Sequence, residues 1–442
     1  MYLLYWIFKP LIYLTWKTVY KIRFIGKQNI DFSKPTLIVA NHTNSVIDPV
    51  AIAVNIRKGV YFLARGDAFA NNFLDWLLSQ FHLLPIYRKS EFADNQEKNK
   101  EVFDRVFDIL DRNHPIIIFS EGTCVQQKIV RPFKKGTAHI AVEYAIRHND
   151  WNRLQILPIG LNYHIYNRFN DDLLQHVGEP FTLQDIGITN EDDKSVIDKI
   201  TLEAEQRLAK TLLLQPIEAL QGMEIPIETI VKMNLNQHVK FKNRKQGLYD
   251  MRKFIVNQLS DEYHKDNNKI IQLKHQLSEL EHELKNHSIS LNVFNKPFYF
   301  WNSIVLIGLM LTFPIFLFGV IVNAIPFFVP KYIADKKVKN PVFKNTVRTV
   351  VGMLLYLLVF GIYFFTFPAL LKVEGFGKRF LAGIISVTIF YSLLMFSYYW
   401  FRVAKIVYGS LRFTFLNKLK KTAIMNAYSS IKQELLNLYS FS

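Results

Sequence analysis

The sequence of 442 residues contains a single cysteine, Cys124. A chain with one thiol forms no internal disulfide, which is consistent with a reducing compartment. It shows no internal repeat, no cluster of metal-ligating residues and no nucleotide-binding loop of adequate specificity, so we expect neither a metal nor a nucleotide cofactor. No small-residue cleavage site follows the apolar N-terminal segment, which argues against a removed signal peptide.

Acidic residues are scarce in the last third of the chain. Between positions 291 and 442 there are 17 Lys and Arg but only 3 Asp and Glu, so most of the formal net charge of +17 lies there. A basic excess can indicate nucleic-acid binding, but no base-stacking or groove-reading motif accompanies it. Attraction to anionic lipid headgroups explains it more simply, at about 1 kcal/mol per near-surface cation. We therefore expect membrane lipids as partners and no nucleic acid.

Charge is absent from three long apolar stretches of the same region: 297–330, 349–371 and 380–401. Stretches of this length match a bilayer core of about 30 Å. Lys and Arg between the first two stretches and in the tail predict that both lie in the cytosol, with the short loop 372–379 outside. Prolines inside the first stretch favour a re-entrant hairpin, which leaves two full spans.

The rest of the chain divides by composition. The N-terminal segment is aromatic and basic and is broken by Pro10, which indicates a helix in the membrane interface or, alternatively, a plain amphipathic packing helix. Leucines at three-four spacing between 270 and 284 predict a coiled-coil-like seam, which packs on its neighbours or pairs with a second copy to give a homo-oligomer. The expected regions are 1–24 (interfacial), 25–186 (α/β domain), 187–295 (helical), 297–401 (membrane) and 402–442 (basic cytosolic tail).

The first motif with chemical meaning follows a strand. The apolar run 36–40 predicts a buried strand and Asp48-Pro49 predicts a helix start, so Asn41 and His42 lie on the loop between them. A histidine can accept and return a proton near neutral pH, and a carboxylate fixes its tautomer. His42 and Asp48 are therefore candidates for activating a hydroxyl, although a loop histidine beside a helix-capping aspartate is also a common structural feature.

Other motifs follow further predicted strands. A strand at 84–87 ends in Arg88, the strand 115–119 is followed by Glu121, Gly122 and Thr123, and a last strand covers 154–163. A basic loop then precedes a predicted helix at 138–148 and contains Arg131, Lys134 and Lys135. Cations near a glycine turn and a helix N-terminus favour an anion such as phosphate, although a basic run is also typical of a solvated surface. Residues at strand ends of one sheet can converge on one site.

In this order the blocks NHTNSVID, PIYR, FSEGT and LPIG resemble the phospholipid/glycerol acyltransferase family. The resemblance implies an α/β domain with a mixed sheet flanked by helices. It also implies that His42 is the catalytic base, that Asp48 orients it, and that Pro158 lines the site. The expected substrate-binding residues are Asn41, Arg88, Glu121, Gly122, Thr123, Arg131, Lys134 and Lys135.

The blocks depart from the family pattern in two places. Five residues separate His42 from Asp48 where the family most often has four, a spacing that resembles a subgroup of the family. In the third block Ser120 replaces the usual proline and Cys124 replaces the usual arginine, which removes one expected phosphate ligand. The basic loop can supply the charge but not the two-pronged geometry of that arginine. Cys124 is a weak candidate nucleophile, because a nearby carboxylate disfavours its thiolate.

The resemblance implies direct acyl transfer without an acyl-enzyme. His42 takes a proton from a hydroxyl of glycerol 3-phosphate or 1-acylglycerol 3-phosphate, and the oxygen attacks an acyl thioester of coenzyme A or acyl carrier protein. No other cofactor is expected. We expect an integral membrane protein with its active site on the cytosolic face. The main alternative is an inactive, membrane-anchored lipid-binding or scaffold protein of the same fold; a lipid hydrolase using the same pair is a third interpretation.

Overall fold

The computed structural model describes residues 3–66, 69, 71–86, 95–190, 195–214, 217–235, 244–295 and 299–439. The chain forms two compact units. The first comprises Met1–Pro216 and Asn340–Thr346, and the second comprises Ile217–Lys339 and Val347–Ser442. Each unit has a hydrophobic core of its own.

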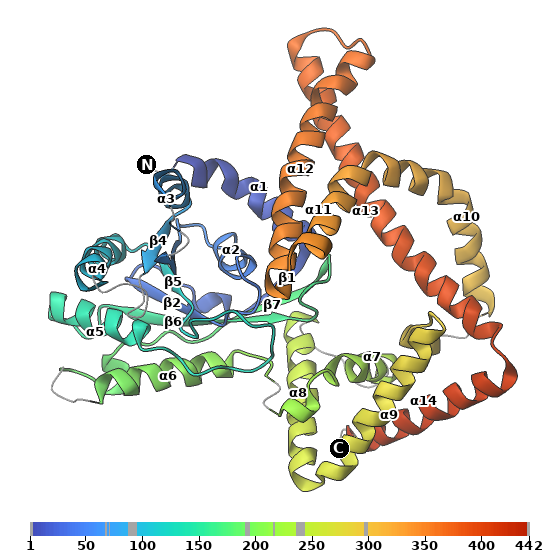
Figure 1. Cartoon of the computed structure of the whole chain (residues 1–442), viewed down its shortest axis with the longest axis horizontal. Helices are drawn as coiled ribbons and strands as arrows, with labels where there is room; N and C mark the ends of the chain where they lie inside the picture. Colours follow the sequence, from blue (N-terminus) through green and yellow to red (C-terminus); the bar gives the residue numbers. More distant parts are fainter. Residues whose placement is uncertain are drawn as a thin grey trace. The chain divides into compact units, whose positions relative to one another are not determined.

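The first unit is built on a seven-stranded sheet with the strand order β1-β7-β6-β2-β5-β3-β4 (Figure 1). Neighbouring strands are parallel except β6 and β7, which are antiparallel. This confirms the mixed α/β sheet expected from the sequence. The strands are β1 (Tyr20–Ile25), β2 (Thr36–Ala40), β3 (Tyr61–Arg65), β4 (Leu83–Ile86), β5 (Ile116–Ile118), β6 (Gln155–Tyr163) and β7 (Asp171–Val177).

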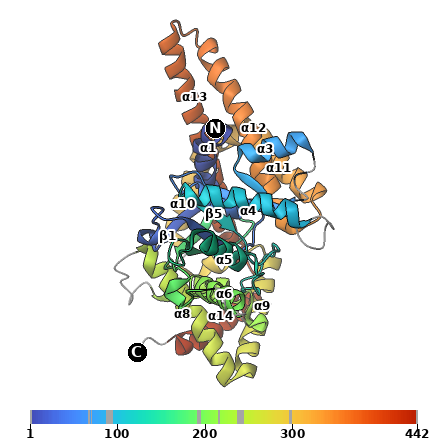
Figure 2. The same cartoon turned by 90° about the vertical axis from the view of Figure 1, so that its left-hand side faces the viewer.

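Helices cover both faces of this sheet, with α1 and α2 on one face and α4, α5 and α6 on the other (Figures 1 and 2). The helices of this unit are α1 (Leu3–Val19), α2 (Ile47–Ala53), α3 (Asn72–Gln80), α4 (Asn95–Asp111), α5 (Gly136–His148) and α6 (Val196–Lys210), with single 3-10 turns η1 (Lys27–Asn29) and η3 (Gln184–Ile186). Strand β2 explains the layering: Leu37 and Val39 pack in one core and Ile38 and Ala40 in the other. A strand buried on both faces has a continuous apolar sequence.

Helix α1 has one buried side and one exposed side. Tyr5 and Trp16 are buried, and Lys9 Nζ donates to the backbone oxygen of Ile56 at 2.7 Å. Large apolar side chains on the other side are about half exposed, among them Ile7 and Leu14. The helix therefore packs on the α/β unit, as expected for a packing helix. Its exposed apolar side is also suited to a membrane interface, and that location stays a prediction.

The second unit has a helical core into which the leucine seam is packed. Its helices are α7 (Glu224–Leu235), α8 (Arg244–Lys265), α9 (Asn267–Asn286) and α14 (Lys418–Leu438), with turns η4 (Glu218–Leu220) and η5 (Leu291–Asn295). All five seam residues are buried: Ile270, Leu273, Leu277, Leu280 and Leu284. They share one core with residues of α7, α8 and α14. The seam thus packs on neighbouring helices of its own chain.

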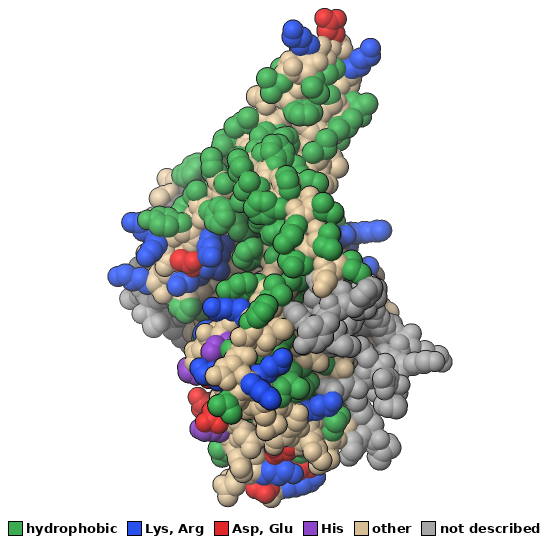
Figure 3. Space-filling model, turned by 90° about the vertical axis from the view of Figure 1, so that its right-hand side faces the viewer, with side chains coloured by type: hydrophobic (Ala, Val, Ile, Leu, Met, Phe, Trp, Pro, Cys, Tyr) green, Lys and Arg blue, Asp and Glu red, His purple; other side chains and the backbone are tan. Residues whose placement is uncertain are grey.

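Four further helices contain the apolar stretches: α10 (Tyr299–Val322), α11 (Ala324–Lys337), α12 (Pro341–Leu370) and α13 (Phe376–Thr414). Among the residues that the structure describes, three helical segments are long and apolar enough to cross a membrane: Ser303–Val322, Pro341–Leu370 and Phe376–Thr414. Figure 3 shows hydrophobic side chains over this helical part, with charged side chains at its tip. The segment between the first two apolar stretches, residues 331–348, was expected to be a cytosolic loop from its Lys and Arg, but only 338–340 lie outside α11 and α12. The hairpin and the membrane sidedness stay predictions.

Candidate active site

The first and third motifs lie side by side because the strands that precede them are neighbours. Strands β2 and β5 are parallel, with Val39 opposite Ile118. Their carboxyl ends therefore lie at the same edge of the sheet. The His42 ring stacks on Phe119, with centroids 4.2 Å apart. The predicted convergence of these two motifs is found in the structure.

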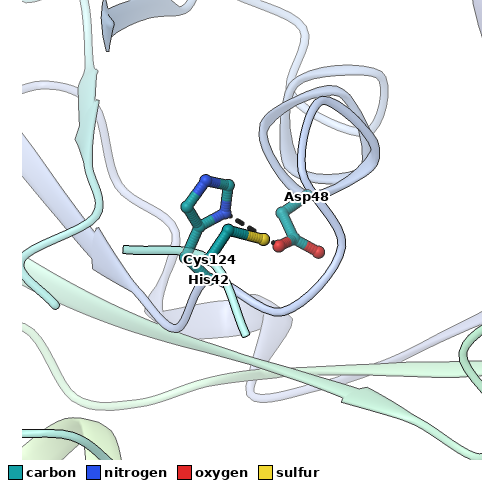
Figure 4. A group of neighbouring side chains, drawn as sticks. All are labelled: His42, Asp48 and Cys124. Atoms are coloured by element: carbon teal, nitrogen blue, oxygen red, sulfur yellow. Dashed lines mark hydrogen bonds and ion pairs between the residues drawn. The ribbon is translucent and has the colours of Figure 1, made fainter. Parts of the chain in front are cut away.

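His42 and Asp48 are in direct contact (Figure 4). His42 Nδ1 lies 3.0 Å from Asp48 Oδ2, and Asp48 is completely buried. The same oxygen accepts the backbone N–H groups of Thr43 and Asn44 at 2.7 Å each, and the Tyr163 hydroxyl donates to Oδ1 at 2.7 Å. Nε2 of the His42 ring points away from the carboxylate (Figure 4). The pair thus has an oriented imidazole with one nitrogen left for a substrate.

The loop between the two residues explains how five intervening residues still bring them together. Helix α2 begins at Ile47, so Asp48 lies in its first turn and is not its N-cap, which is Val46. Ser45 adopts a left-handed conformation with φ of 43°. This conformation turns the chain sharply, and the loop wraps around the carboxylate that its own amides bind.

The neighbours of His42 change its proton affinity. Burial lowers the pKa of the imidazole, but the hydrogen bond with Asp48, together with Cys124, outweighs burial and raises the pKa to about 10. A raised pKa means that the substrate-free site favours the imidazolium at neutral pH. His42 must lose this proton before it can act as a base.

Cys124 belongs to the same group of side chains. Its sulfur accepts the Ser45 N–H at 3.0 Å, and potential ligand atoms of His42, Asp48 and Cys124 all lie within 4.8 Å of one another. Nitrogen, oxygen and sulfur ligands of this kind suit Zn²⁺. The Asp48 carboxylate, however, already accepts four hydrogen bonds, so we assign it to orienting His42. The sequence alone indicated no histidine near Cys124, whereas the structure places His42 beside it.

Arg131 joins the third motif to His42. Its Nη2 lies 2.6 Å from Glu121 Oε2 and 2.8 Å from the Thr123 backbone oxygen, and its Nη1 lies 2.8 Å from Thr123 Oγ1. Nη2 also approaches the His42 backbone oxygen at 3.5 Å. Glu121 is 3% exposed, and burial raises its pKa while Arg131 opposes the shift. Most donors of Arg131 are therefore occupied within the protein.

The other expected binding residues are less closely grouped. The Asn41 amide exchanges two hydrogen bonds with the backbone of Leu161, which anchors the end of β2 to β6. Gly122 takes the left-handed conformation that its turn requires, with φ of 69°. Lys134 is exposed, and Lys135 pairs with Asp198 of α6 at 2.6 Å. Arg88 lies outside the described residues.

Sequence reasoning missed the partners that hold Asp48. Pro158 of the fourth block pairs with Val39 in the middle of the sheet, whereas Tyr163 at the end of the same strand reaches Asp48. Asn44 was part of the quoted first block but received no role. A tyrosine at the carboxyl end of a predicted strand was the available signal, yet nothing in the sequence indicated which carboxylate it would meet.

Part of the chain is similar to known proteins. Residues 21–162 match the family described as Acyltransferase. The chain carries an acyltransferase domain. Glycerol-3-phosphate O-acyltransferase 1 of Saccharomyces cerevisiae is 24% identical over 56% of this chain and 33% of its own length. Glycerol-3-phosphate acyltransferase 3 of Danio rerio is 29% identical over 30% of this chain and 30% of its own length.

A solved structure is also similar to part of the chain. The crystal structure of the 1-acyl-sn-glycerophosphate (LPA) acyltransferase PlsC from Thermotoga maritima aligns with a TM-score of 0.32 at 17% identity, over 45% of this chain and 79% of that one. The chain spans about a third of the length of the curated relatives it matches.

Proposed function

We propose that the protein is a membrane-bound acyltransferase that moves a fatty acyl group from an acyl thioester to a hydroxyl of glycerol 3-phosphate or 1-acylglycerol 3-phosphate. The observation that carries this proposal is the His42–Asp48 contact at 3.0 Å, with the carboxylate held by three further donors. The acyltransferase domain and its glycerol-3-phosphate acyltransferase relatives support the choice of reaction.

In this proposal neutral His42 takes the proton of the acceptor hydroxyl through Nε2 as the oxygen attacks the thioester carbonyl. Asp48 stabilises the imidazolium that forms, and the proton then passes to the departing thiolate. General base catalysis of this kind contributes about 10²- to 10⁴-fold, so placement of the hydroxyl must supply much of the remainder.

The acceptor phosphate needs cations that are not already engaged. Arg131 is largely occupied by Glu121 and Thr123, and Lys135 is paired with Asp198. We therefore assign Arg131 mainly to holding the third motif in place, and we propose that Lys134, which is exposed beside this motif, contributes to phosphate binding together with Arg88. The active site faces the cytosol in this proposal, where soluble thioester donors are available.

Replacement of His42 tests the proposal against the scaffold alternative. Purified full-length protein would be assayed with labelled acyl thioester and a panel of acceptors: glycerol 3-phosphate, 1-acylglycerol 3-phosphate and glycerol. We expect His42→Ala to abolish acyl incorporation while the protein remains in the membrane fraction. His139→Ala is the matched control, because His139 lies exposed on α5. A wild-type protein that acylates no acceptor in the panel would support the scaffold, and acyl release without an acceptor would support a hydrolase.

A further inference from the structure

Asp48 belongs to a buried group of side chains that reaches a distant part of the chain. Tyr163, which donates to Asp48, lies edge-on to Tyr20, with ring centroids 5.6 Å apart. The two tyrosines are 4% and 1% exposed. A hydroxyl buried to this degree requires hydrogen-bond partners inside the protein.

Two asparagine amides meet at the Tyr20 hydroxyl. Asn44 Nδ2 donates to Tyr20 Oη and to the backbone oxygen of Tyr166, both at 3.3 Å. Asn345 Nδ2 donates to the same two oxygen atoms, at 3.1 Å to Tyr166. The backbone N–H of Asn44 also bonds to Asp48. Asn44 therefore connects the catalytic carboxylate to the place where Asn345 binds.

Asn345 enters this group from the first turns of α12. Residues Asn340–Thr346 belong to the first unit, while the same helix continues to Leu370 in the second. Asn345 is 7% exposed. Burial of an amide is unfavourable unless hydrogen bonds compensate it, so its two bonds fix the start of α12 against Tyr20 and Tyr166, whose oxygen atoms also accept from Asn44 of the loop around Asp48.

We propose that Asn345 is a positioning residue of the site: through Tyr20 and Asn44 it holds the loop 43–46 around Asp48 and thereby keeps His42 in the orientation for base catalysis. The inference rests on the proposed acyl transfer. Buried hydrogen-bond groups of this kind act as a unit. The acyltransferase site is then complete only when the start of an apolar, membrane-length helix is in place.

Kinetics of full-length variants test this role. We expect Asn345→Ala to lower kcat by about tenfold to a hundredfold, because a small misplacement of a catalytic group has effects of that size. The KM values for donor and acceptor should stay within about twofold, since loss of rate without loss of binding marks an effect on the reaction step. Asn162→Ala is the matched control: Asn162 is another buried amide of this unit, bonded to Thr211 and Leu213 instead. It should leave kcat unchanged.

A double-mutant cycle tests the connection through Tyr20. Tyr20→Phe removes the oxygen at which both amides meet. If the group acts as a unit, Asn345→Ala combined with Tyr20→Phe should lose little more activity than the worse single variant. Unchanged kcat in Asn345→Ala, or losses that simply multiply in the double variant, would overturn the inference.

Cys124 gives a readout that does not need activity. It is the only thiol of the chain, and its sulfur accepts the N–H of Ser45 in the same loop. At about pH 9.5, a unit above the usual thiol pKa of about 8.5, we expect iodoacetamide to modify Cys124 several times faster in Asn345→Ala than in wild type or Asn162→Ala. An inactive wild type with this difference in alkylation would refute the proposed function and keep the structural link. Equal alkylation rates in all three proteins would refute the link itself.

Discussion

Asp48 accepts hydrogen bonds from donors that come from different parts of the chain: the imidazole, two amides of its own loop and the hydroxyl of Tyr163. Charge-assisted hydrogen bonds are about twice as strong as neutral ones. These four donors fix the carboxylate in one position beside the imidazole. It can therefore favour the imidazolium of His42 without moving.

The raised pKa of His42 predicts how the rate depends on pH. Because His42 acts as a base only when neutral, kcat/KM should rise as pH increases toward its pKa of about 10. Asp48→Asn removes the carboxylate that favours the protonated ring, so this rise should move to lower pH. The maximal rate should also fall, by about 10²- to 10⁴-fold. The measurement is a pH profile of kcat/KM for both proteins; a profile with the same midpoint in both would contradict the assignment.

The hydrogen bonds of the Arg131 guanidinium predict that its shape, and not only its positive charge, is needed for activity. Arg131→Lys keeps the positive charge but loses the guanidinium that bonds Glu121 and both oxygens of Thr123, so we expect kcat/KM to fall by at least about tenfold. Arg147→Lys is the control, because Arg147 forms an exposed pair with Asp104 and such pairs contribute about 0–1 kcal/mol. Steady-state assays of both variants check this, and a fully active Arg131→Lys would show that charge alone suffices.

At the scale of elements, α9 shows what the leucine seam stabilises. The five seam residues are buried in a core shared with α7, α8 and α14. The same helix exposes Ile271 to 46%. An apolar seam on a helix can be covered by a second copy or by the same chain, and here helices of the same chain cover it.

Truncation of the seam should therefore reduce the stability of the protein and leave its oligomeric mass unchanged. We expect Leu277→Ala to lower the free energy of unfolding by about 2–5 kcal/mol, the usual cost of a cavity at a buried leucine. Ile271→Ala should have a much smaller effect. Thermal denaturation in detergent and light scattering measure the two quantities. Loss of a dimer without a lower melting temperature would instead indicate that the seam joins two copies.

At the scale of the whole molecule, the distribution of Lys and Arg predicts membrane sidedness. The short connection 338–340 lies between basic ends of α11 and α12, which predicts that it lies in the cytosol, and the loop between α12 and α13 should lie outside. Lys339→Cys and Glu374→Cys, each in a Cys124→Ser background, give proteins with one exposed thiol. We choose Lys339 over the neighbouring Asn340, because the Asn340 side chain accepts the Val342 N–H at the start of α12 and its replacement would remove this cap.

A membrane-impermeant maleimide added to intact cells should label position 374 and leave position 339 unlabelled until the cells are opened. Labelling of both positions after opening is the control for accessibility. Labelling of position 339 in intact cells would contradict the predicted sidedness.

Much of this architecture was predictable because its signals are local. The predicted strand 36–40 corresponds to β2, and the predicted strand 154–163 corresponds to β6 within one residue. The predicted helix 138–148 corresponds to α5, which begins two residues earlier. Apolar periodicity reports burial of a segment irrespective of its partners. The helical segments on either side of 338–340 were missed because Lys and Arg at helix ends resemble a loop in composition.

The sequence by itself determined which residues are proposed to carry the chemistry: His42, Asp48 and the third motif stand at strand ends, and motif order alone pointed to an acyltransferase domain. Only the tertiary structure decided how they are held. Tyr163 reaches Asp48 across 115 residues, and Asn345 reaches Tyr20, which Asn44 of the Asp48 loop also contacts, across 325 residues. Arg131 binds Glu121. Contacts across such separations form only when the strands assemble into the sheet and the start of α12 packs beside them, so no local pattern in the chain encodes them.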